Sequence, residues 1–173
     1  MNYILYKQSD NSIFGIRAHQ NPLDNDLIAS ILLFSSNQAG ETILFHAAAG
    51  GVGQIFAQWA NSIGAKVIGT VGSDEKIEIA KANGYAHVIN YSKDDFAKEV
   101  MKITNNEGVS AVFDGVGKNT FKGSIASLKP RGLMASFGNA SGPLDPVNVP
   151  KDIQPKGLYL TRPSIAQYFT NRK

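Results

Sequence analysis

A glycine-rich segment, Ala47-Ala48-Ala49-Gly50-Gly51-Val52-Gly53, carries the residue types and spacing that bind phosphate. Glycine lets a pyrophosphate approach the backbone, where free N–H groups and the positive end of a helix dipole attract the anion. The usual dinucleotide fingerprint would place glycines at positions 48, 50 and 53, so Ala48 departs from it. We predict that a dinucleotide contacts Ala49, Gly50, Gly51, Val52 and Gly53. The alternative is a glycine-rich turn that only packs a helix on a strand.

A second set of residues bears on which dinucleotide would bind. NAD-selective folds usually end their second strand with Asp or Glu, which holds the ribose 2′-hydroxyl. Here the corresponding strand ends Val71-Gly72-Ser73, and Lys76 follows in the next helix. A hydroxyl and an ammonium suit a 2′-phosphate, so Ser73 and Lys76 favour NADPH; the alternative is that Lys76 is a solvated helix residue. Tyr91 follows the third strand, where it either lies near the adenosine phosphate or packs as a half-buried aromatic.

These residues need strands and helices to position them, and the sequence supplies a regular alternation. Apolar runs bounded by glycines predict strands, and apolar residues at spacings of three and four predict helices. Such an alternation predicts an α/β fold with a doubly wound parallel sheet, the Rossmann fold. The strands are expected at 42–46, 66–71, 88–90, 111–114, 133–137 and 158–161, and the helices at 52–63, 74–82, 96–103 and 120–128.

The composition is that of an ordinary globular domain, and it excludes some chemistry. Of the 173 residues, 43% are hydrophobic and 18% are charged, with a formal net charge of +3. No cysteine is present, so neither a disulfide framework nor a thiolate zinc site can form. The apolar run at 27–34 is too short to span a bilayer, and the N-terminus does not resemble a signal peptide, so a cytoplasmic location is expected.

Several blocks in the same order resemble the zinc-independent quinone oxidoreductases, which belong with zeta-crystallin in the medium-chain dehydrogenase/reductase superfamily. The resemblance covers about residues 39–168. Its blocks are Ile43–Gly53, Val67–Lys76, Asn90-Tyr91, Asp114–Gly117, Phe137–Gly142 and Leu160–Ser164.

The resemblance implies that NADPH is oxidised and a quinone is reduced. By resemblance, Ser73, Lys76 and Tyr91 match positions near the 2′-phosphate. Val116 and the segment Phe137, Gly138 and Asn139 match loops near the ribose and nicotinamide. The cofactor carries the hydride, so we expect no catalytic side chain and no metal. His46 is expected to pack or form hydrogen bonds at a strand end.

The organisation of the chain departs from the family. The substrate module that opens the family's sequences has no match in residues 1–38, which form an unmatched segment. Residues 39–168 form the nucleotide-binding domain and residues 169–173 a tail, so we expect a fragment or a shortened relative.

Two alternatives to a quinone reductase stay open: an NADPH-binding remnant without catalysis, and an RNA-binding protein, for which no basic stripe with aromatics is found. We expect a homodimer formed through the edge strand at 158–161.

Overall fold

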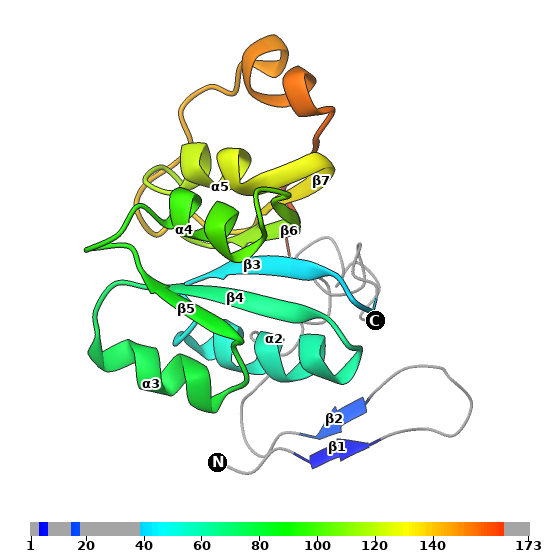
Figure 1. Cartoon of the computed structure of the whole chain (residues 1–173), viewed down its shortest axis with the longest axis vertical. Coiled ribbons are helices and arrows are strands. Elements are labelled where there is room, and N and C mark those ends of the chain that lie inside the picture. Colours follow the sequence, from blue (N-terminus) through cyan, green and yellow to red (C-terminus); the bar gives the residue numbers. More distant parts are fainter. Residues whose placement is uncertain (1–3, 7–14, 18–38, 165–173) are drawn as a thin grey trace, which may run out of the picture.

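A six-stranded parallel sheet forms the centre of the molecule (Figure 1). The computed structural model describes residues 4–6, 15–17 and 39–164. The strand order is β5-β4-β3-β6-β7-β8, and every neighbouring pair in this sheet is parallel. The strands are β3 (Thr42–His46), β4 (Lys66–Val71), β5 (His87–Asn90), β6 (Val109–Asp114), β7 (Leu128–Ser136) and β8 (Tyr159–Thr161). From β3 the chain adds strands on one side as far as β5, and it then adds β6, β7 and β8 on the other side of β3. This change of side between β3 and β6 confirms the predicted doubly wound Rossmann fold.

Within residues 39–164, four helices cover the two faces of the sheet. They are α2 (Gly51–Ser62), α3 (Glu75–Ala82), α4 (Phe96–Ile103) and α5 (Phe121–Ser127). Figure 1 shows α2 and α3 on one side of the sheet, with α4 and α5 on the other. Each connection from strand to parallel strand therefore carries the chain across a face, as parallel pairing requires.

The core consists of two layers, because successive side chains of a strand point to opposite faces. On β3, Ile43 and Phe45 join the cluster beneath α2, whereas Leu44 joins the cluster beneath α4 and α5. The α2 layer includes a group of aromatic rings in which the Phe45 and Phe56 centroids lie 4.5 Å apart. All of these side chains are buried, so both layers fix the sheet rigidly between helices.

The fifth predicted strand is wrong at its beginning. We expected it to start at residue 133, but β7 begins at Leu128, directly after α5. Leu128 pairs with Val109, and the next pair is Leu133 with Ala111, so the intervening residues of β7 bulge out of register. Arg131 adopts a left-handed conformation with φ of 62° within this bulge. Pro130 and Gly132 lie on either side of Arg131 in this bulge.

Between β7 and β8, where the sequence predicted neither a strand nor a helix, the chain forms two short helical turns. Residues Val149–Ile153 form a wide helical turn, η1, and Gln154–Lys156 form a tighter turn, η2. The Asn148 side chain accepts a hydrogen bond from the Lys151 N–H at 3.0 Å and caps the first turn. Figure 1 shows both turns beyond β7, at the end of the sheet remote from β5.

In the N-terminal segment, β1 (Ile4–Tyr6) and β2 (Gly15–Arg17) pair with each other in antiparallel register. The apolar run at 27–34 lies outside the described residues, as do residues 165–173.

Candidate functional site

The predicted site residues follow the carboxyl ends of five neighbouring parallel strands. The segment 49–53 follows β3, Ser73 and Lys76 follow β4, and Tyr91 follows β5. Val116 follows β6, and the segment 137–139 follows β7. Since the strands are parallel, these ends share one edge of the sheet, where open α/β sheets bind their ligands. The structure therefore brings all the predicted residues to one edge.

The first turn of α2 presents free backbone donors at this edge. Gly50 is the N-cap residue, and α2 has neither a side-chain cap nor an acidic residue in its first turn. The amide of Gln54 bonds to the Gly50 carbonyl at 3.0 Å. Within residues 39–164, the amides of Gly51, Val52 and Gly53 have no hydrogen-bond acceptor. Three free N–H groups and the helix dipole leave this end suited to an anion.

Two close contacts explain how the loop tolerates Ala48 where a glycine is usual. Ala48 is fully buried, and a Cβ added at Gly69 of β4 would lie 2.6 Å from the Ala48 Cβ. The missing side chain at Gly69 therefore makes room for the methyl group of Ala48. At Gly53, an added Cβ would lie 2.6 Å from the Ala48 carbonyl oxygen, so this third glycine keeps α2 close to β3.

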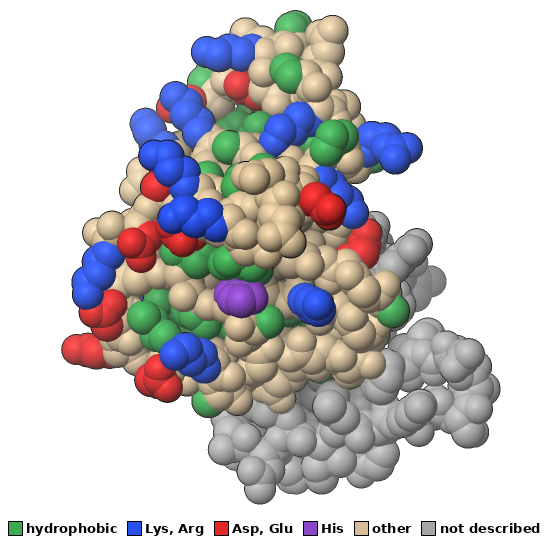
Figure 2. Space-filling model, in the orientation of Figure 1, with side chains coloured by type: hydrophobic (Ala, Val, Ile, Leu, Met, Phe, Trp, Pro, Cys, Tyr) green, Lys and Arg blue, Asp and Glu red, His purple; other side chains and the backbone are tan. Residues whose placement is uncertain are grey.

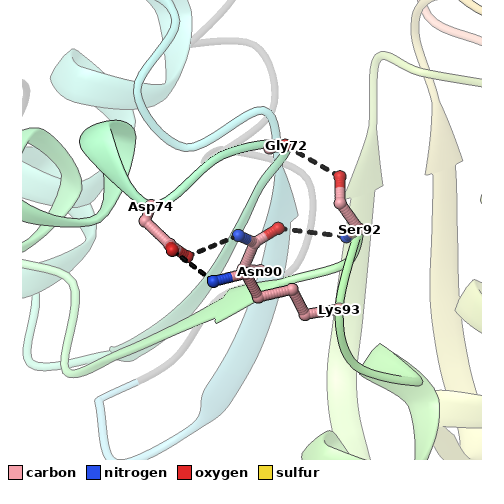
Figure 3. A network of polar contacts seen from close by, with 5 residues as sticks. All are labelled: Gly72, Asp74, Asn90, Ser92 and Lys93. Atoms are coloured by element: carbon pink, nitrogen blue, oxygen red, sulfur yellow. Dashed lines mark hydrogen bonds and ion pairs between the residues drawn. The ribbon is translucent and has the colours of Figure 1, made fainter.

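The end of the site at β4 and β5 is held by contacts between the two strand ends. The Ser92 hydroxyl donates to the Gly72 carbonyl at 2.8 Å (Figure 3). An added Cβ at Gly72 would lie 2.8 Å from the Tyr91 hydroxyl, so the ring of Tyr91 covers this glycine. Tyr91 is nevertheless 41% exposed, and Lys76 is exposed. The ring of Tyr91 therefore packs on Gly72, as one of the two interpretations expects, and its position near an adenosine phosphate stays a prediction.

The loops after β6 and β7 are pressed together at the opposite end of the site. The amide of Phe137 donates to the Asp114 carbonyl at 2.9 Å, and the amide of Ser141 donates to the Val116 carbonyl at 2.8 Å. A Cβ added at Gly138 would lie 2.3 Å from the Gly115 carbonyl oxygen. Phe137 points its ring into the core, 5.8 Å from the ring of Phe45 between centroids.

Asp114, the last residue of β6, organises the loop that contains Val116, and the sequence prediction missed this role. Its fully buried carboxylate accepts hydrogen bonds from the amides of Val116 at 2.8 Å and Gly117 at 2.9 Å. It also accepts from the hydroxyls of Thr120 at 2.8 Å and Ser124 at 3.1 Å. An acidic residue that ends a buried strand before a glycine is the available sequence signal, because Asp commonly accepts from backbone amides two and three residues on.

His46 lies beside this buried group and forms hydrogen bonds through both of its ring nitrogens. Its Nδ1 lies 2.8 Å from the Thr70 hydroxyl and its Nε2 lies 2.9 Å from the Ser124 hydroxyl. The ring also meets that of Phe96 edge-on at 4.9 Å. Burial lowers the pKa of His46, and the charge of Asp114 partly opposes this effect. The predicted packing and hydrogen bonding of His46 at a strand end are confirmed.

Arg162, which follows β8, is a second residue that sequence reasoning missed. Its guanidinium donates to the Gly138 carbonyl at 2.8 Å and to the Ser136 hydroxyl at 3.2 Å. These bonds attach the segment after β8 to the loop after β7.

Across the residues that the structure describes, no three His, Cys, Asp or Glu side chains converge as metal ligands would. No helix in that part of the chain has the length and apolar character of a membrane span.

Comparison with known proteins places this geometry in a family. The family model described as zinc-binding dehydrogenase matches residues 51–172. A quinone oxidoreductase of Salmonella typhimurium is 50% identical over 133 residues, covering 77% of this chain and 41% of that protein. A 2-haloacrylate reductase of Burkholderia sp. is 45% identical over 149 residues, covering 84% of this chain and 45% of that protein.

Solved structures of similar proteins support the same family. The crystal structure of a 2-haloacrylate reductase aligns with a TM-score of 0.84 at 43% identity, covering 87% of this chain and 48% of that chain. The Escherichia coli quinone oxidoreductase, solved in complex with NADPH, aligns with a TM-score of 0.82 at 43% identity, covering 87% of this chain and 47% of that chain. The chain thus spans somewhat less than half the length of these relatives. It belongs to the zinc-binding dehydrogenase family of the medium-chain dehydrogenase/reductase superfamily.

Proposed function

We propose that this chain binds NADPH across the carboxyl edge of its sheet and forms the coenzyme-binding portion of an NADPH-dependent quinone oxidoreductase. The observation that carries the proposal is the start of α2, where the amides of Gly51, Val52 and Gly53 lack acceptors within the described residues. A pyrophosphate supplies acceptors at this position. Ala49, which is half-buried, and Gly50, which is exposed, complete the turn around it.

Along the edge, each end of the dinucleotide has its own set of residues. We place the 2′-phosphate beside Ser73, Lys76 and Tyr91, because the ammonium of Lys76 is exposed at the end of β4. We place the ribose and nicotinamide beside Val116 and the backbone of Phe137, Gly138 and Asn139. The similar Escherichia coli enzyme was solved with NADPH, which supports this coenzyme.

The proposed reaction is a hydride transfer, for which bound NADPH supplies the hydride. The residues of this chain bind and orient the coenzyme, and Asp114 holds the loop of Val116 in place through two amides. We propose a quinone as acceptor, in line with relatives named quinone oxidoreductase. An electron-poor alkene is the alternative acceptor, because one relative is a 2-haloacrylate reductase. An NADPH-binding remnant without turnover is the second alternative.

Zinc does not fit the residues of this chain, despite the family's name. Structural and catalytic zinc sites of dehydrogenases draw on cysteine or clustered histidine ligands. The chain has no cysteine, and both ring nitrogens of His46 are engaged by hydroxyls. We therefore propose a zinc-independent protein and derive no step through a metal.

The domain bounds, the cellular location and the pairing with a second copy are also proposals. Residues 39–168 are proposed as the coenzyme-binding domain, and a cytoplasmic location is proposed from the sequence. The edge strand β8 exposes Tyr159 (64%) and Leu160 (41%), which supports pairing with a second copy. On the face that Figure 2 shows, Lys and Arg side chains are interspersed with Asp and Glu, so nothing there favours RNA.

Calorimetric titration of the purified chain with NADPH, followed by an assay with 1,4-benzoquinone, tests the proposal. Binding with turnover supports the quinone reductase. Binding without turnover of benzoquinone or 2-chloroacrylate supports the remnant. Absence of heat with both NADPH and NADH contradicts the proposed function.

A further inference from the structure

Asp74 lies three residues beyond the end of β4, near the position from which an acidic residue holds the coenzyme in NAD-selective folds. It lies 21 positions after Gly53, and such folds place an acidic residue about 20 residues beyond the glycine loop to bind the ribose 2′-hydroxyl. It is also the N-cap residue of α3, yet its carboxylate does not cap that helix. The carboxylate is instead directed toward the end of β5 (Figure 3).

Two side chains from β5 and the turn after it engage this carboxylate. The Asn90 amide donates to Asp74 Oδ1 at 2.7 Å, and the Lys93 ammonium forms an ion pair and hydrogen bond with Asp74 Oδ2. Asn90 is only 5% exposed, and its Oδ1 accepts the Ser92 N–H at 3.0 Å. The buried amide is therefore fixed at both ends, and it fixes the direction of Asp74.

The contacts keep both partners of the ion pair charged. The hydrogen bonds from Lys93 and then Asn90 lower the pKa of Asp74, and the hydrogen bond to Asp74 raises the pKa of Lys93. A positive charge thus stands directly against the carboxylate. An unpaired carboxylate here would repel a 2′-phosphate and attract a ribose hydroxyl, and pairing with the exposed Lys93 ammonium reduces both effects.

We propose that Lys93 and Asn90 set coenzyme preference by masking Asp74, which removes the carboxylate that would otherwise select NADH. This inference rests on the proposed NADPH site and names its specificity-determining residues. Lys93 acts through Asp74 rather than by contact with the phosphate. That role separates it from Lys76, whose side chain forms no ion pair or hydrogen bond within the described residues.

A double-mutant cycle on the full 173-residue chain tests the masking. NADPH and NADH are titrated separately into the wild type, Lys93→Met, Asp74→Asn and the double variant. The Lys93→Met change is expected to lower the ratio of the NADH Kd to the NADPH Kd by about three- to tenfold, which is a relative gain in NADH binding. The same change in the Asp74→Asn background is expected to shift the ratio by less than about twofold, because no carboxylate remains to unmask.

The matched control is Lys98→Met, which removes an exposed lysine of α4 that pairs with Asp95 at 3.2 Å rather than with Asp74. It is expected to leave the ratio unchanged. An equal effect of Lys93→Met in both backgrounds would show direct contact with the phosphate and overturn the inference. So would an unchanged ratio in Lys93→Met, or a wild type that prefers NADH. If neither coenzyme binds the wild type, the proposed function itself fails and the inference falls with it.

Discussion

The Nε2 atom of His46 lies 2.9 Å from the hydroxyl oxygen of Ser124, and both side chains are fully buried. The Ser124 hydroxyl can donate to the Asp114 carboxylate at 3.1 Å or to the Thr120 carbonyl at 2.9 Å, so its proton has an acceptor other than the ring. We therefore assign the ring proton to Nε2, which donates to Ser124, and let Nδ1 accept from the Thr70 hydroxyl. A neutral His46 thus joins β3 to α5 with all its hydrogen-bonding groups satisfied.

Stability is expected to fall as the pH is lowered from 7.5 to 5.5, because burial lowers the pKa of His46 in the folded state. The unfolded chain takes up this proton near the ordinary histidine pKa of about 6.5, so it binds more protons than the folded chain below that pH. The contribution of His46 is full above that value and is lost as the pH falls. The slope approaches at most about 1.4 kcal/mol per pH unit.

Urea unfolding across this pH range, for the wild type and His46→Asn, measures the effect. The variant lacks the titrating ring, so its free energy of unfolding should depend less on pH. Equal pH slopes for the two proteins would contradict the assignment of a neutral, buried His46.

Replacing Asp114 with Ala is expected to lower the free energy of unfolding by about 3 kcal/mol. The change leaves two amides and two hydroxyls without the buried acceptor that they share. NADPH affinity should fall as well, because the loop of Val116 loses its anchor. Asp145→Ala is the control, since this exposed carboxylate pairs with Lys118 at the surface, and it should change stability by less than about 0.5 kcal/mol.

Replacing Lys156 with Met is expected to destabilise the fold by about 1–2 kcal/mol. The Lys156 ammonium donates to the carbonyls of Ala126 at 2.8 Å and Leu128 at 2.6 Å, at the end of α5. The Ala126 carbonyl lies in the last turn of α5, where it has no helical partner, and a cation is favoured at a helix C-terminus. Thermal unfolding beside Lys151→Met, whose exposed lysine lies in η1, measures the effect. A similar small change in both variants would count against the cap.

A methyl group added at Gly53 should be far more damaging than one added at Gly50. At Gly53 it would lie 2.6 Å from the Ala48 carbonyl and 2.7 Å from the Ala47 carbonyl, whereas at Gly50 it would lie 3.1 Å from the Ala47 carbonyl. We expect Gly53→Ala to cost about 2 kcal/mol or more and Gly50→Ala less than about 1 kcal/mol. Comparable losses in chemical denaturation would refute the close approach of α2 to β3.

The elements with a clear periodicity could be predicted from the sequence. The strands Thr42–His46 and Lys66–Val71 have their predicted bounds, because each is a buried apolar run delimited by glycines or turns. The start of β7 could not be found in this way. Pro130 and Gly132 ordinarily interrupt strands, and only pairing with β6 shows that the chain resumes the sheet around them.

The site was predictable as positions along the chain, but its contacts were not. The glycine loop indicated the start of α2, and the resemblance indicated the loops after β6 and β7. Nothing local in the sequence predicts that Asp74 turns away from its own helix toward Asn90 and Lys93, 16 and 19 residues further on. Such pairings depend on which strand ends become neighbours, which the sheet order decides.

The most direct test of the account observes the amides at the start of α2. In a ¹H–¹⁵N NMR titration of the full chain with NADPH, the amide resonances of Gly51, Val52 and Gly53 should show the largest saturable shifts, because these N–H groups gain phosphate acceptors. Saturable NADPH binding that leaves these three resonances unmoved would contradict the central claim that the pyrophosphate lies on this helix N-terminus.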